Sequence, residues 1–130
     1  MDYEKLMEKA KEASTKAYCK YSDFPVGACI LTKDGNAYTG CNFENASYGL
    51  SICAERSAAG AAIVNGERLF KAVAIYSPKM ENCIPCGACR QVLSEFEAPE
   101  GTDIITYTQN GLRIYKLSEL LPEGFKLVLD

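Results

Sequence analysis

Four cysteines are spaced in a way that could hold a metal ion. Cys86 and Cys89 form a Cys-x-x-Cys pair directly after Pro85, and Cys53 and Cys83 precede that pair in the chain. Residues three apart share one face of a helix, so Cys86 and Cys89 can present both sulfurs to one point. A helix N-terminus also favours the thiolate, the metal-binding form of cysteine. Because Cys53 starts another predicted helix, two helix starts could supply three thiolates and leave a fourth tetrahedral position for water, as in catalytic zinc sites.

Glu55 determines what a water molecule at such a site could do. It lies two residues after Cys53, and positions two apart in a regular helix do not face each other. The two side chains can therefore meet only if Cys53 lies where the chain is still entering the helix. A carboxylate beside a zinc-bound water can take a proton from it and deliver that proton elsewhere.

Spacing alone leaves other interpretations open. The pair could be a thioredoxin-type redox site, although it does not follow an early strand as that fold requires. The cysteines could also be plain buried residues. A sharper alternative is a closed four-thiolate zinc or iron–sulfur site with Cys83 as the fourth ligand. Spacing does not separate this closed site from the open, catalytic one.

Composition limits the remaining classes of function. The chain has 130 residues, 14 Lys and Arg against 17 Asp and Glu, a net charge of −3, seven cysteines and no histidine. We expect a single domain over residues 1–130. The lack of histidine excludes Ser-His-Asp triads, Cys-His dyads and histidine-containing metal sites. An acidic chain without a basic cluster argues against binding to nucleic acid or to a membrane.

The odd number of cysteines and the charged N-terminal segment, 1–11, predict reduced thiols in the cytoplasm. The longest nearly apolar run, 57–64, is far too short to span a bilayer.

Hydrophobic periodicity and turn signals predict the elements that position these residues. Asp34-Gly35 joins two β-prone runs as a hairpin, Ser51 can cap a helix, and Asn65-Gly66 can end it. The predicted helices cover 2–18, 52–64, 86–96 and 118–121, and the predicted strands cover 26–32, 37–42, 71–77, 103–108 and 112–115. Alternation of strands and helices after the hairpin favours an α/β fold. We expect a three-layer α/β/α domain with a mixed, about five-stranded sheet.

The motifs together resemble a known family. Cys53-Ala-Glu55 followed by Pro85-Cys-Gly-Ala-Cys89 is similar to the signature of the zinc nucleoside and nucleobase deaminases. Further blocks are YSDFPVGA at 21–28, GCNFENA at 40–46 and CRQV at 89–92. With these the chain resembles the small homotetrameric cytidine deaminases that act on free nucleosides and hold zinc with three cysteines.

The resemblance implies roles for the residues of the signature. Cys53, Cys86 and Cys89 would bind one Zn²⁺ per subunit. Glu55 would move protons between water, N3 of cytosine and the departing amine, which converts cytidine and 2′-deoxycytidine to uridine and 2′-deoxyuridine with release of ammonia, a step of pyrimidine salvage. Arg56 resembles an arginine that donates hydrogen bonds to the thiolates.

The resemblance also implies a set of residues that bind the nucleoside. Asn42 and Glu44 would hold the ribose 3′-hydroxyl, Phe24 would pack against the base, and the backbone N–H of Ala54 would donate to O2 of the base. Tyr48 and Phe125 match aromatic residues that cross subunit interfaces in tetramers. Phe24, Tyr48 and Phe125 could instead be packing residues, and Asn42 could be a turn or strand-end residue. The resemblance assigns no role to Cys83, and Cys19, Cys29 and Cys41 are expected to be small buried apolar residues.

Three alternatives to this interpretation differ in what they leave unexplained. A deaminase of the same fold that acts on another ring, such as blasticidin S, does not account for the ribose-type motif at 42–46. An enzyme acting on RNA or DNA bases needs a basic groove, and this chain is acidic. A non-catalytic domain stabilised by zinc, with Cys83 as the fourth ligand, leaves Glu55 without a role.

Overall fold

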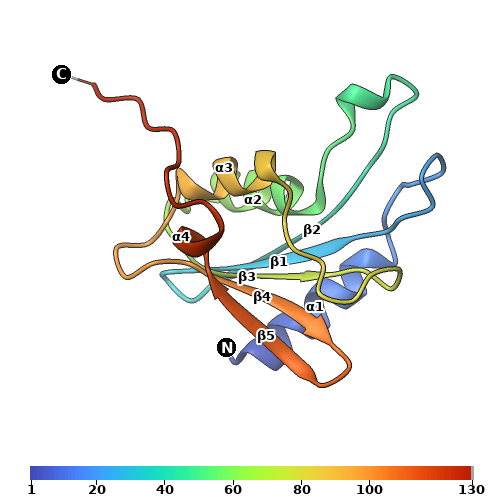
Figure 1. The fold of residues 1–130 in the computed structure, drawn as a ribbon, viewed down its shortest axis with the longest axis horizontal. Helices are drawn as coiled ribbons and strands as arrows, with labels where there is room; N and C mark the ends of the chain where they lie inside the picture. Colours follow the sequence, from blue (N-terminus) through green and yellow to red (C-terminus); the bar gives the residue numbers. More distant parts are fainter. Residues whose placement is uncertain (130) are drawn as a thin grey trace.

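A computed structural model of the protein describes residues 1–129 and contains five strands with helices on both sides (Figure 1). In chain order the elements are α1 (Tyr3–Ser14), β1 (Gly27–Thr32), β2 (Ala37–Cys41), the short 3₁₀ helix η1 (Tyr48–Leu50), α2 (Ala54–Val64), β3 (Phe70–Tyr76), α3 (Gly87–Ser94), β4 (Asp103–Thr108), β5 (Gly111–Lys116) and α4 (Leu117–Leu120). This order of helices and strands agrees with the predicted one, with η1 as the addition.

The sheet has the strand order β2-β1-β3-β4-β5. Only β3 and β4 run parallel, and the other neighbouring pairs are antiparallel, which confirms the predicted mixed, five-stranded sheet. The hairpin between β1 and β2 turns at Gly35, whose φ of 89° lies in the left-handed region that favours glycine.

Alternate residues of the central strands build two separate cores. One face of β1 and β3 buries Ile30, Val73 and Ile75 against α2 and α3. The opposite face buries Leu31 and Ala74 against α1. Figure 1 shows the same division, with α1 on one side of the sheet and α2 and α3 on the other. The three-layer α/β/α prediction is therefore confirmed.

A glycine lets α2 lie directly on the edge strand β2. A Cβ atom at Gly40 would come within 2.3 Å of the backbone nitrogen of Ala58 and 2.7 Å of the carbonyl oxygen of Ala54. Because the atoms that such a side chain would meet belong to the backbone of α2, no larger residue fits there. This close approach sets the position of the start of α2, where Cys53 and Glu55 lie.

Several predicted boundaries were wrong by a few residues. The first helix ends at Ser14 and not at residue 18, because the backbone of Tyr18 bonds to the segment after β2 instead, with its N–H donating to Asn42 O at 3.0 Å. Ser51 does not cap α2, since that position belongs to Cys53. The helix predicted at 86–96 covers Gly87–Ser94. Within the described residues, 1–129, no helix has both the length and the apolar character needed to cross a membrane.

Candidate metal centre and active site

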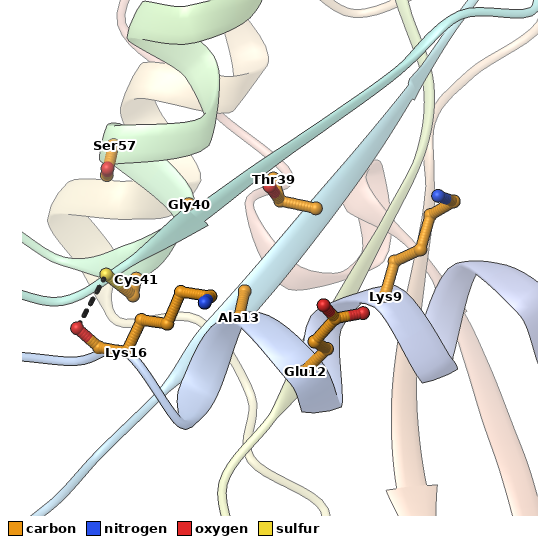
Figure 2. A pocket seen from close by; sticks show the side chains of 8 residues that line it. All are labelled: Lys9, Glu12, Ala13, Lys16, Thr39, Gly40, Cys41 and Ser57. Atoms are coloured by element: carbon orange, nitrogen blue, oxygen red, sulfur yellow. Dashed lines mark hydrogen bonds between the residues drawn. The ribbon is translucent and has the colours of Figure 1, made fainter.

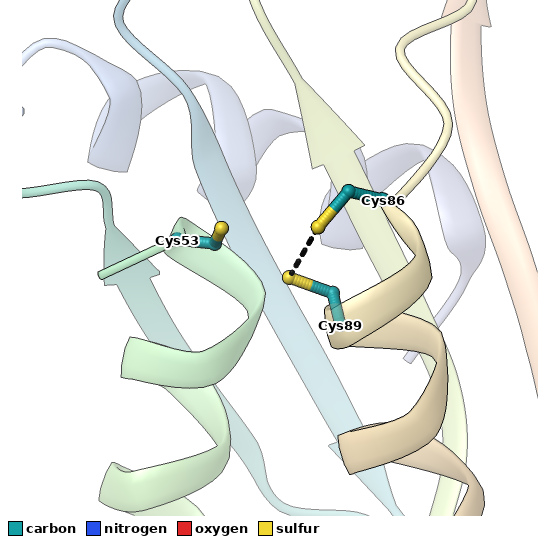
Figure 3. A group of neighbouring side chains, drawn as sticks. All are labelled: Cys53, Cys86 and Cys89. Carbon is teal, nitrogen blue, oxygen red and sulfur yellow. Dashed lines mark hydrogen bonds between the residues drawn. The ribbon is translucent and has the colours of Figure 1, made fainter. Parts of the chain in front are cut away.

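Three cysteine thiols converge where two helices begin (Figure 3). Cys53 is the N-cap residue of α2 and Cys86 is the N-cap residue of α3, and both have extended backbones. Cys89 follows one turn into α3. The Sγ atoms of the three residues all lie within 4.8 Å of one another, and those of Cys86 and Cys89 are 3.6 Å apart. The two helices therefore deliver three sulfurs to one point, as their spacing predicted.

The geometry and chemistry of this cluster fit a zinc ion. Tetrahedral zinc with Zn–S bonds of about 2.3 Å places its sulfurs about 3.8 Å apart, within the range seen here. A disulfide needs about 2.05 Å, so the Cys86–Cys89 contact is not one. Soft thiolates select zinc or iron–sulfur clusters over magnesium and calcium.

The charge of the cluster is distributed unevenly. Hydrogen bonds from the thiols of Cys89 and Cys86, together with the Arg56 guanidinium, lower the pKa of Cys53 to about 6. The same hydrogen bond to Cys53 raises the pKa of Cys89, which holds the shared proton. Cys53 is thus the thiol of the cluster whose ionised form is favoured, and the positive charge of Arg56 acts in that direction.

Glu55 lies against the cluster and is buried, with 5% of its surface exposed. Burial raises the pKa of Glu55 to about 7, and the charge of Cys53 acts in the same direction. The extended backbone of Cys53, with φ −73° and ψ 154°, is what lets side chains two positions apart reach one site. A carboxyl group whose pKa is near neutrality can both accept and release a proton at physiological pH.

Cys83 lies outside the group of converging sulfurs, which contains only Cys53, Cys86 and Cys89 among residues 1–129. It is half-buried and packs against the core between the sheet and α2. Burial and the nearby charge of Glu55 raise the pKa of Cys83 to about 11, so its thiol stays protonated. Of the other cysteines, Cys29 is buried as predicted, whereas Cys19 and Cys41 are only half-buried.

The two residues expected at the ribose both bind the segment before β1. The side-chain amide of Asn42 donates to Phe24 O at 2.9 Å and accepts from Val26 N–H at 2.9 Å. Glu44 accepts backbone N–H groups from Tyr21 and Ser22, each at 3.1 Å. Both side chains therefore have a structural role in this chain, whatever else they bind.

The remaining predicted residues are placed differently. Ala54 is buried as the first residue of α2, and its backbone N–H lies in the first turn, where helix donors have no partner inside the helix. Phe24 is half-buried. Tyr48 and Phe125 are 62% and 70% exposed. Figure 1 draws the segment of η1 and the C-terminal segment at well-separated positions in the chain.

Three polar residues around the site were missed by the sequence analysis. Ser22 bonds to Glu44, Arg90 donates to Pro85 O at 2.8 Å and to Leu120 O at 3.0 Å, and Gln91 bonds to the backbone of Phe125 in both directions. All three lie inside the family-like motifs at 21–28 and 89–92, and these motifs were the feature of the sequence that could have pointed to them. Their partners are distant in sequence and could not be read from it.

A hollow of about 430 Å³ lies away from the predicted site residues, between α1, β2 and α2 (Figure 2). Lys9 and Glu12 line it from α1, and Lys16 lines it from the turn that follows α1. The Cys41 thiol donates to Lys16 O at 3.6 Å. It contains none of the converging sulfurs and no residue predicted to bind substrate.

Comparison with known proteins agrees with the fold and the cluster. A family model described as the cytidine and deoxycytidylate deaminase zinc-binding region matches residues 1–102. The chain is 42% identical over 125 residues to a cytidine deaminase of Sporosarcina psychrophila, covering 96% of this chain and 92% of that protein. It is also 42% identical over 125 residues to a cytidine deaminase of Halalkalibacterium halodurans, covering 96% and 95%.

The solved structures show the same relationship. A crystal structure of cytidine deaminase from Burkholderia pseudomallei matches with a TM-score of 0.88 and 43% identity, covering 96% of this chain and all of that one. The chain therefore belongs to the cytidine and deoxycytidylate deaminase family of enzymes.

Proposed function

We propose that this protein is a zinc-dependent aminohydrolase that converts cytidine and 2′-deoxycytidine to uridine and 2′-deoxyuridine and releases ammonia. The observation that carries the proposal is a buried carboxyl group, Glu55, beside a cluster of three converging thiols, where it interacts with Cys53 and Cys89. Neither a structural zinc site nor a redox pair needs such a group. In this proposal residues 1–130 form a single domain. The enzyme works in the cytoplasm, and its reaction is a step of pyrimidine salvage.

Cys53, Cys86 and Cys89 would hold one zinc ion per subunit, and Arg56 would offset part of their negative charge. A bound zinc ion acts as a Lewis acid that lowers the pKa of water toward neutrality. The N-termini of α2 and α3 favour the ionised thiols through their backbone N–H groups and helix dipoles.

Glu55 moves the protons of the reaction. Its raised pKa lets it accept a proton from the attacking water and pass it to N3 of cytosine, and then take the proton of the new C4 hydroxyl and pass it to the amine that leaves as ammonia. Burial serves this role because water that surrounds a carboxylate would stabilise its charged form and return its pKa toward 4.

Asn42 and Glu44 would bind the ribose 3′-hydroxyl through the hydrogen-bonding positions that their contacts with the segment before β1 leave free. An ionised carboxylate has about four acceptor positions, and three donors from Tyr21 and Ser22 occupy part of them. A contact at the 3′-hydroxyl does not discriminate against deoxycytidine, which lacks only the 2′-hydroxyl. Phe24 would pack on the base, and the N–H of Ala54 would donate to O2.

The direct test of the function is an assay of ammonia release by zinc-loaded protein. The substrate panel contains cytidine, 2′-deoxycytidine, their monophosphates and blasticidin S. We expect turnover of the two free nucleosides and little or none of the others. Selective turnover of blasticidin S would replace the proposed substrate, and no turnover with zinc bound would support a non-catalytic zinc domain.

Substitution of Glu44 by Gln is expected to raise the KM for cytidine, with a smaller loss of kcat because a misplaced base reacts poorly. Free cytosine lacks the ribose, so its slow turnover should barely change in the same variant. Steady-state kinetics on both compounds measures this contrast. An equal loss on cytidine and cytosine would assign Glu44 to the loop rather than to the sugar.

We expect the enzyme to be a homotetramer in which Tyr48 and Phe125 complete the pocket of a neighbouring subunit. Support comes from their high exposure and from the apolar surface along α2 and α3 formed by Ile63, Val64 and Val92. Sedimentation velocity at assay concentrations measures the assembly state. A fully active monomer would contradict both the tetramer and the shared pocket.

A further inference from the structure

The segment between α1 and β1 is held by a single carboxylate. Glu44 lies after β2, and its Oε1 accepts the backbone N–H groups of Tyr21 and Ser22 at 3.1 Å each. The carboxylate is buried, with 9% of Glu44 exposed. These contacts join residues more than 20 positions apart. The orientation of this carboxylate and the path of residues 21–24 therefore depend on each other.

The hydroxyl of Ser22 adds a contact of a different kind. It donates a hydrogen bond to the second carboxylate oxygen, Glu44 Oε2, and it accepts the backbone N–H of Phe24 at 3.1 Å. A serine hydroxyl has one proton to donate, and here that proton is directed at the carboxylate. With both oxygens engaged, Glu44 cannot rotate without losing a charge-assisted hydrogen bond, which is stronger than a neutral one.

The backbone of the same segment is constrained between these contacts. Asp23 has φ 55°, in the left-handed region, and its N–H donates to Cys19 O at 2.8 Å. A non-glycine residue keeps such a conformation where surrounding bonds hold it. Asn42 completes the constraint by donating to Phe24 O at 2.9 Å. The N–H and the carbonyl of Phe24 are thus tied to Ser22 and Asn42.

We infer that Ser22 is a positioning residue for substrate binding, whose hydroxyl orients the Glu44 carboxylate toward the sugar. The inference rests on the proposed function, which assigns the ribose contact to Glu44. Ser22 itself does not touch the reacting atoms. Its effect belongs to the binding of the nucleoside and to the choice of sugar.

The kinetic test compares cytidine with 3′-deoxycytidine in zinc-loaded protein. We expect Ser22→Ala to lower kcat/KM for cytidine about tenfold, mostly through KM, since hydrogen bonds to charged groups have effects of this size. The loss for 3′-deoxycytidine, which has no group for Glu44 to hold, should be about twofold or less. Ser22→Thr keeps a hydroxyl and should restore most of the selectivity for cytidine.

Ser77 provides a matched control. Its hydroxyl also accepts a backbone N–H two residues further on, from Lys79 at 3.2 Å, but it has no bond to Glu44. Ser77→Ala should leave the ratio of the two nucleosides unchanged. In a Glu44→Gln background, Ser22→Ala should have no further effect on that ratio, because residues that act through one contact are not additive.

A second readout does not depend on activity. The hydrogen bond from Ser22 is the largest cause that holds the pKa of Glu44 below its ordinary value. Titration of the Glu44 side-chain carboxyl carbon by NMR should therefore show a higher pKa in Ser22→Ala than in the parent protein or in Ser77→Ala.

The outcomes separate this inference from the function on which it rests. Equal losses on both nucleosides in Ser22→Ala, or an unchanged pKa of Glu44, would overturn the positioning role while cytidine deamination stands. An unchanged nucleoside ratio in Glu44→Gln would overturn the ribose contact and, with it, the inference. Absence of cytidine turnover in the parent protein would instead overturn the proposed function.

Discussion

Glu55→Gln is expected to abolish measurable deamination of cytidine while the protein keeps its zinc. General acid–base catalysis contributes about 10²–10⁴-fold to a rate, and a group that serves several proton transfers can exceed that range. Glutamine has nearly the same shape but carries no transferable proton at this pH. We therefore expect kcat to fall by at least about 10²-fold, with a smaller change in KM. Turnover measured together with zinc content checks this result.

The stability of the metal-free protein supplies the control for this variant. Burial raises the pKa of Glu55 to about 7, above its value in an unfolded chain. At low pH Glu55 is neutral in the folded protein, and its burial then costs no ionisation energy. The free energy of unfolding therefore falls as the pH rises through about 7 and the buried carboxyl ionises. Because glutamine stays neutral, Glu55→Gln should have a Tm at pH 8 no lower than that of the parent protein. Near-normal kcat in zinc-loaded Glu55→Gln would end the deaminase mechanism.

Substitution of Cys86 is expected to weaken zinc binding strongly, whereas substitution of Cys83 is expected to leave it intact. Cys86→Ser removes one of the three converging thiols, and a serine hydroxyl is not deprotonated as a thiol is. Loss of partners outside the ligand set alone lowers metal affinity by about 10–100-fold, so loss of a ligand should exceed about 10²-fold. Cys83→Ser should retain one zinc per subunit, because Cys83 packs against the core outside the cluster.

Metal analysis after dialysis, and competition with a chromophoric chelator, measure both variants. A buried serine at position 83 could lower stability through its unpaired hydroxyl, so Cys83→Ala serves as the matched variant that keeps this position apolar. If Cys83→Ser and Cys83→Ala lose zinc as completely as Cys86→Ser, the site is a closed four-cysteine centre. The open fourth position, and the catalytic function with it, would then be wrong.

Most of the candidate metal centre could be predicted from the local pattern of the sequence. A Cys-x-x-Cys pair after a proline places two sulfurs on one helix face by periodicity alone, and the requirement that Cys53 precede its helix followed from the two-residue spacing to Glu55. Both expectations agree with N-cap positions for Cys53 and Cys86. The five-stranded mixed sheet was also predictable, because alternation of apolar residues and turn signals are local properties of the sequence.

Tertiary contacts decided what the local pattern left open. Cys83 and Cys86 are neighbours in sequence, and only packing against the core separates Cys83 from the cluster. The first helix ends at Ser14 because the backbone of Tyr18 finds partners beyond β2, whereas its sequence would have allowed a longer helix.

The contacts of Glu44 illustrate the same limit for substrate binding. Its bonds to residues 21 and 22 cross more than 20 positions of the chain and depend on how the segment before β1 returns to the end of β2. Residue types and their spacing determined the chemistry of this protein, because a reaction needs particular groups. The folded chain determined which of those groups meet and how they are held, because burial and long-range hydrogen bonds exist only after folding.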